Sequence, residues 1–176
     1  MKKHLSLVAG LALVAGLSTA VQAQDPGTAT GASPLSLNTY VTVTVPTILK
    51  LSIADTSTTV LAPTETNFDN GFQDVASAVS ATVKSNKPYS LSINGGAGTW
   101  TGTGGARANK PVGDLLWGTG PTPSTPLTTS AAAIVALTST GTSGATSTVN
   151  YRINWGYTND TPGTYTIPVV YTLTAP

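Results

Sequence analysis

Apolar and polar residues alternate along much of this chain after residue 34. Because the side chains of a β-strand point alternately to its two faces, each alternating run predicts a strand with one buried face. Such runs cover residues 35–45, 49–53, 75–83, 89–93, 135–137, 149–155 and 165–173. They predict seven or eight strands, and after residue 23 no segment shows a convincing helical stripe.

The segments between these runs are rich in Gly, Pro, Asn and Thr, as chain turns require. They are residues 86–88, 94–96, 102–105, 118–126 and 158–163. Short alternating strands separated by turns are typical of antiparallel sheets with one packed face. The pattern therefore predicts an all-β protein, a single immunoglobulin-like antiparallel β-sandwich. Residues 102–130 are the least strand-like part, and we expect a long loop with a binding surface there.

The amino-terminal segment has the three parts of a secretory signal peptide. Lys2 and Lys3 precede an apolar stretch, and small residues end it at Ala23. We expect cleavage after residue 23, a flexible linker over residues 24–34 and one domain over residues 35–176. The protein is then expected to be exported to the periplasm, the cell surface or the medium, with no membrane span after cleavage.

Cleavage changes the charge and the chemistry of the chain. Without Lys2 and Lys3, six Lys and Arg remain of eight, against seven Asp and Glu. This near-neutral balance gives no footprint for nucleic acid or an anionic membrane. Cysteine is absent, and the one histidine, His4, lies in the signal segment. These absences exclude Ser-His-Asp and Cys-His catalysis and an ordinary zinc site, and we predict no enzyme activity, cofactor or metal.

The acidic segment of residues 65–74 is a candidate for catalysis or metal binding. Glu65, Asp69 and Asp74 supply carboxylates, and a glycosidase needs a pair of them at a set spacing. Asn67 beside the two Asp residues would suit calcium, although the pattern does not match the twelve-residue calcium loop. The preferred interpretation is a solvated turn, anchored to the core by two aromatic residues. These are Phe68 and Phe72.

Tryptophans offer a second candidate surface. Trp100 and Trp117 lie in or beside Gly-rich segments that would be exposed loops, where their rings could stack on sugars. The alternative is burial for packing, as is usual for large aromatics. Trp155 continues the alternation of residues 149–155 and is predicted to belong to the core.

Two stretches carry a resemblance to a known family. Residues 151–157 (YRINWGY), followed by DTPGTY at 160–165 and a strand that ends at 176, look like the close of bacterial pilin-type sandwiches. Residues 85–95 (SNKPYSLSING) also resemble the strand-turn pattern of spore-coat-U-like secreted pilin subunits. Gly163 and Tyr165 fit a tyrosine corner, in which the tyrosine ties the preceding loop to the backbone.

The resemblance implies a subunit that lacks a strand and is completed by the amino-terminal extension of a neighbour. The candidate donor strand is residues 35–45, which Pro46 separates from the next run. Its apolar positions are Leu35, Leu37, Val41, Val43 and Val45. The alternative is that this segment is the domain's own first strand, bent at Pro46. The expected partner is another copy or a related surface subunit, and a carbohydrate- or wall-binding module is the alternative function.

Overall fold

The computed structural model describes residues 31, 34, 37, 39–54 and 60–176. The predicted signal peptide, Leu35 and most of the predicted linker lie outside the described residues. The chain divides into two units, residues 1–44 and 45–176, and the second contains every strand and helix described below.

The larger sheet has five strands, and all its neighbouring strands are antiparallel. Their order across the sheet is β1 (Leu49–Ile53), β2 (Phe72–Ser85), β8 (Thr142–Asn154), β5 (Leu115–Gly118) and β6 (Thr125–Pro126). The long strands β2 and β8 form its centre, and β1 is an edge strand.

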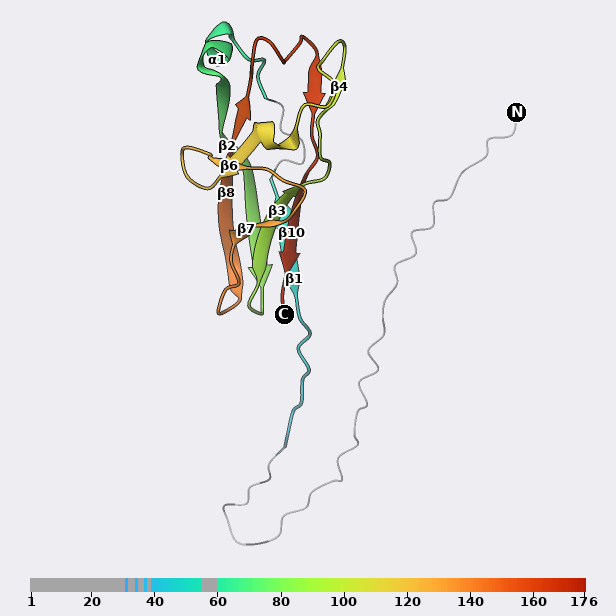
Figure 1. The fold of residues 1–176 in the computed structure, drawn as a ribbon. Helices are drawn as coiled ribbons and strands as arrows, with labels where there is room; N and C mark the ends of the chain where they lie inside the picture. Colours follow the sequence, from blue (N-terminus) through green and yellow to red (C-terminus); the bar gives the residue numbers. More distant parts are fainter. Residues whose placement is uncertain (1–30, 32–33, 35–36, 38, 55–59) are drawn as a thin grey trace, which may run out of the picture. The chain divides into compact units, whose positions relative to one another are not determined.

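The second sheet has three antiparallel strands in the order β10 (Val169–Thr174), β3 (Ser90–Gly95) and β7 (Ala132–Val135). A separate pair joins β4 (Thr101–Thr103) to β9 (Thr164–Thr166). One short helix, α1 (Glu65–Asn70), and one 3-10 turn, η1 (Val112–Asp114), complete the described elements (Figure 1). Neither is long and apolar enough to cross a membrane.

The core lies between the two sheets. Val83 of β2 and Val149 of β8 are buried from one side, and Leu91 and Ile93 of β3 from the other. Alternate residues of β3 are buried, as the sequence pattern predicts for a strand with one packed face. The prediction of an all-β antiparallel sandwich is confirmed.

Several elements differ from the predicted ones. Pro168 has no N–H to donate, and the predicted strand over 165–173 is divided into β9 and β10 on either side of it. Residues 102–130 are not one long loop, since they contain η1 and the short strands β5 and β6 and begin in β4. The predicted turn over 65–74 contains helix α1, which Thr64 and Asn67 begin with a reciprocal capping box and Gly71 ends in the left-handed conformation.

A bulge interrupts the pairing of β2 with β8. Val75 pairs with Tyr151 and Val79 with Val149, so β2 carries two more residues than β8 in this interval. Ser77 has a φ of 51° there, and its backbone N–H donates to Asn150 Oδ1 at 2.6 Å.

The predicted strand over residues 35–45 is absent from the described part of that segment. Residue 37 and residues 39–48 are assigned to no strand. Leu37, Val41, Val43 and Val45 are all exposed, Val41 to 88%. None of these described residues forms a first strand of the domain bent at Pro46, and β1 is the first strand among the described residues.

Candidate functional site

A long apolar groove of about 1030 Å³ opens in the sandwich. Leu51 and Ile53 of edge strand β1 border it, and residues 60–63 add to its lining. Side chains of the larger sheet also line it, among them Val79, Tyr151 and Ile153.

The opposite border of the groove is an unbroken run from Gly163 to Tyr171. A strand that turned only one face toward the groove would contribute every second residue, because its side chains alternate. Consecutive lining residues mean that the edge of this segment faces the groove. β10 pairs with β3 on one side only and is an edge strand, so its other edge has backbone groups to offer.

The core is incomplete along this groove. On the central strands, Ile93 and Val149 are fully buried. The corresponding inward residues of the two edge strands, Ile53 of β1 and Val169 and Tyr171 of β10, are only partly buried. A sheet edge whose inward apolar side chains remain half-exposed is suited to accept a further strand.

One polar contact lies within the groove lining. The hydroxyl oxygens of Tyr151 and Tyr171 are 2.6 Å apart. Burial raises the pKa of Tyr171 far above its ordinary value, and the charge of Tyr151 and the hydrogen bond to it raise it further. Burial also raises the pKa of Tyr151, with the hydrogen bond to Tyr171 acting in the opposite direction. The two phenols therefore stay neutral and satisfy one another.

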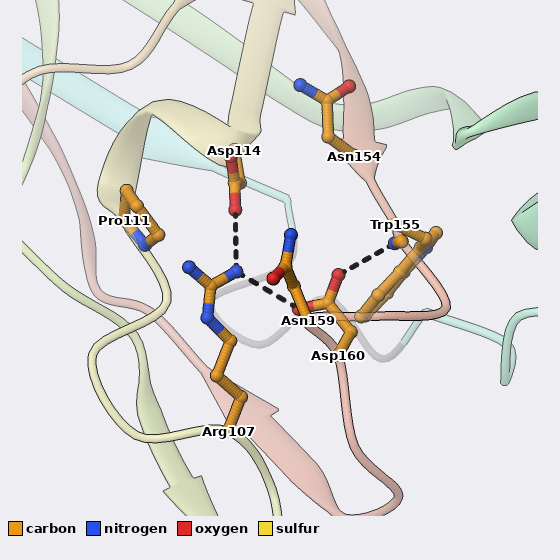
Figure 2. Close-up of a pocket in the computed structure, with 8 residues that line it drawn as sticks. Arg107, Pro111, Asp114, Asn154, Trp155, Asn159 and Asp160 are labelled. Atoms are coloured by element: carbon orange, nitrogen blue, oxygen red, sulfur yellow. Dashed lines mark hydrogen bonds and ion pairs between the residues drawn. The ribbon is translucent and has the colours of Figure 1, made fainter.

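A charged cluster occupies a recess of about 230 Å³ beside the turn that follows β8. Figure 2 shows the Arg107 guanidinium between Asp114 of η1 and Asp160 of the turn, with Nη1 3.9 Å from Asp114 Oδ2 and 3.7 Å from Asp160 Oδ1. The backbone N–H of Gly156 donates to Asp160 Oδ2 at 2.9 Å.

Lys110 is the fourth charged residue of this cluster. Its side chain is fully buried, and Nζ donates to Asp160 Oδ1 at 2.9 Å and to the Asn154 carbonyl at 2.6 Å. Nζ lies 3.3 Å from Asp114 Oδ2 and 4.6 Å from the centre of the Trp155 ring. A buried ammonium is costly unless it is paired, and here two carboxylates balance the two cations.

The tyrosine corner is confirmed at the edge of this cluster. The Tyr165 hydroxyl donates to the Thr161 carbonyl at 2.7 Å and accepts the Arg107 backbone N–H at 2.9 Å. The Tyr165 ring also packs edge-on against Trp155, with 5.7 Å between the ring centres. Tyr165 thus holds the turn that carries Asp160 against the loop that carries Arg107.

Trp100 and Trp117 are not in exposed loops. Their side chains belong to the core, at 8% and 7% exposure, and neither indole N–H has a hydrogen-bond partner. The Gly-rich segments beside them fold over the core, and Trp100 is fixed there by its backbone N–H, which donates to Lys110 O. Neither ring presents an open face to a sugar. Trp155, predicted to be core, is half-buried against it.

Two of the acidic residues of 65–74 have side-chain partners within the fold. Asp74 makes a two-bond ion pair with Arg152, at 2.6 and 2.7 Å. Asp69 accepts a hydrogen bond from the Tyr157 hydroxyl at 3.1 Å. Among the described residues, no group of three or more His, Cys, Asp or Glu side chains could hold a metal ion.

Searches against protein-family models and against curated proteins gave no match for this sequence. The resemblance to secreted pilin subunits therefore stays a prediction.

Sequence reasoning missed the charged cluster. Lys110 follows a Gly-rich segment and precedes a proline, a context typical of an exposed loop. Its partner Asp160 is 50 positions away, and no local pattern joins them. The one available signal in the sequence was the small number of charged residues, which leaves few possible pairs of opposite charge.

Proposed function

We propose that this protein is an exported structural subunit that assembles by strand addition, with residues 35–45 of one copy filling the groove of the next. The observation that carries the proposal is an apolar groove bordered by two edge strands, β1 and β10, in a chain that also exposes an alternating apolar segment.

The chemistry of the two parts is complementary. One face of residues 35–45 consists of Leu at 35 and 37, Thr39, and Val at 41, 43 and 45. The groove offers it half-buried apolar side chains, and its border from 163 to 171 contains β9 and the start of β10, each paired with a neighbour on one side only. Backbone hydrogen bonds would supply affinity, and the alternate side chains would fill the groove. Assembly of this kind needs no enzyme, cofactor or nucleic acid.

A matched pair of substitutions in the full chain tests this. Val41→Asp with Val43→Asp puts charge on the face that enters the groove, whereas Thr42→Asp with Thr44→Asp puts the same charge on the opposite face. Burying a valine contributes about 1.5–3 kcal/mol, so the first pair should weaken self-association at least about 100-fold. Light scattering after size-exclusion chromatography, with negative-stain microscopy, measures the assembly.

We expect filaments or ladders from the unaltered protein and from the variant Thr42→Asp with Thr44→Asp. We expect monomers from the variant Val41→Asp with Val43→Asp, called the valine variant below. A synthetic peptide of residues 35–45 should bind the monomeric valine variant, whose groove is intact, and the same peptide with Asp at 41 and 43 should not. An unaltered protein that stays monomeric at all concentrations, or two variants that assemble alike, would overturn it.

A further inference from the structure

We infer that Lys110 and Asp160 condense into an intramolecular amide, a covalent crosslink between the β4–η1 loop and the turn after β8. This inference is independent of the proposed function. It starts from the contact of an amine with a carboxyl group, Nζ to Oδ1 at 2.9 Å, in a site that water hardly reaches. The side chain of Lys110 is fully buried and that of Asp160 is 4% exposed.

The condensation requires the neutral amine and the neutral acid. An ammonium and a carboxylate do not condense with one another, so a proton must first move from the nitrogen to the carboxylate oxygen. Transfer of one proton along the existing hydrogen bond, from Lys110 Nζ to Asp160 Oδ1, gives the neutral amine and the neutral acid. The rings of Trp155 and Tyr165, with centres 4.6 and 5.9 Å from Nζ, border the amine.

The remaining groups have the roles that the condensation requires. Addition of Nζ to Cγ of Asp160 forms the N–C bond and places negative charge on Oδ2, where the Gly156 N–H already donates at 2.9 Å. The Asp114 carboxylate, 3.3 Å from Nζ, takes the proton that nitrogen loses on addition. The Cγ–Oδ1 bond then breaks, and this proton departs with Oδ1 as water. Asp114 is thus a catalytic residue of the proposed step.

The product fits the same surroundings. The new amide keeps one N–H, and the Asn154 carbonyl already accepts from this nitrogen at 2.6 Å. Its carbonyl oxygen keeps the Gly156 N–H. Two charges disappear, and the Arg107 guanidinium keeps Asp114 as its ion-pair partner. In a chain without cysteine, this bond would close a loop between residues 50 positions apart.

Mass spectrometry of the purified full protein tests the inference. Trypsin cleaves after Arg107 and Arg152 but not between Lys110 and Pro111, so the crosslink joins peptide 108–152 to peptide 153–176. We expect that branched product, and an intact mass lower than that of the uncrosslinked chain by one water. Loss of water by cyclisation elsewhere would leave the two peptides separate and would contradict the inference.

Three variants test the roles of Asp160, Lys110 and Asp114 separately. Asp160→Asn should form the same amide with release of ammonia, and its crosslinked mass should equal that of the unaltered protein. Lys110→Arg should give separate peptides. Asp114→Asn should fold, by circular dichroism, and stay uncrosslinked for far longer than the unaltered protein. A folded unaltered protein at full mass would show that the cluster is an ion pair only and would overturn the inference, and rapid crosslinking of Asp114→Asn would overturn the role of Asp114.

Discussion

The hydroxyl of Tyr151 on β8 and the hydroxyl of Tyr171 on β10 form a 2.6 Å hydrogen bond that links the two sheets of the sandwich. It lies in a groove whose lining is largely apolar. Because burial limits the access of water to the two tyrosines, each hydroxyl has the other as its partner.

Tyr171→Phe should destabilise the fold by about 1–3 kcal/mol, because it leaves the buried Tyr151 hydroxyl unpaired. Urea denaturation measures the free energy of unfolding, with an unchanged m-value as the check on the two-state transition. Thr172→Val is the matched control, since it removes a hydroxyl from the exposed face of the same strand and should cost less than about 0.5 kcal/mol. The double variant Tyr151→Phe with Tyr171→Phe should cost less than the sum of the single changes. Additive costs would argue against a shared bond.

The same pair predicts a loss of stability at alkaline pH. The pKa values of Tyr151 and Tyr171 are raised in the folded protein, so both keep their protons after the unfolded chain has begun to lose them at about pH 10. Their contribution is complete below that pH and is lost as the pH rises, because ionisation favours the unfolded chain. The free energy of unfolding, measured in urea from pH 8 to 11, should fall more steeply for the unaltered protein than for the double phenylalanine variant. Parallel pH profiles would contradict this account.

Alternation in the sequence predicted those strands that have one buried and one solvated face. Leu91 and Ile93 of β3 are fully buried, and the residues between them are not, so the pattern and the structure coincide there. On β2, by contrast, the bulge at Ser77 inserts two residues, and the adjacent residues Ala78 and Val79 are both buried. A bulge depends on the partner strand, which a local pattern does not contain.

The candidate sites were predictable to different degrees. The candidate donor segment of residues 35–45 stands out in the sequence because its apolar positions alternate, although its described residues belong to no strand. The groove could not be predicted in this way, because it exists only where β1 and β10 end two separate sheets. Trp100 was misplaced because glycine suggested an exposed loop, whereas the bridge between Thr99 and Pro111 folds that segment back on itself. The contact of Lys110 with Asp160 is purely tertiary.

The tyrosine corner gives a further stability prediction. Tyr165→Phe removes the bond to the Thr161 carbonyl and leaves the Arg107 backbone N–H without its acceptor, so we expect a loss of about 1–3 kcal/mol in urea denaturation. Tyr157→Phe is the control, because this residue is 64% exposed and its hydroxyl bonds reach only surface groups of α1. Tyr157→Phe should lower the free energy of unfolding by less than about 0.5 kcal/mol. Equal losses of stability in the two variants would mean that the hydrogen bonds of the Tyr165 hydroxyl contribute nothing and that only the packing of its ring matters.

Gly163, at the start of the run that borders the groove, is predicted to tolerate no side chain. A Cβ at this position would lie 2.5 Å from the Thr103 carbonyl oxygen and in contact with the backbone nitrogen of Ala106, and its φ is 155°. The obstacles are backbone atoms of the neighbouring loop, which cannot move as a side-chain end would. Gly163→Ala should therefore destabilise the protein by about 2–3 kcal/mol and disturb the pairing of β9 with β4.

Gly98→Ala is the matched control, since a Cβ there meets nothing within 4 Å. We expect it to change the free energy of unfolding by less than about 0.5 kcal/mol. The comparison isolates the steric effect, because both changes also remove a glycine's freedom from the unfolded chain, which by itself stabilises slightly. If Gly163→Ala were as stable as Gly98→Ala, the loop of residues 103–106 would have to yield without cost, and the close packing of that loop against the groove border would be refuted.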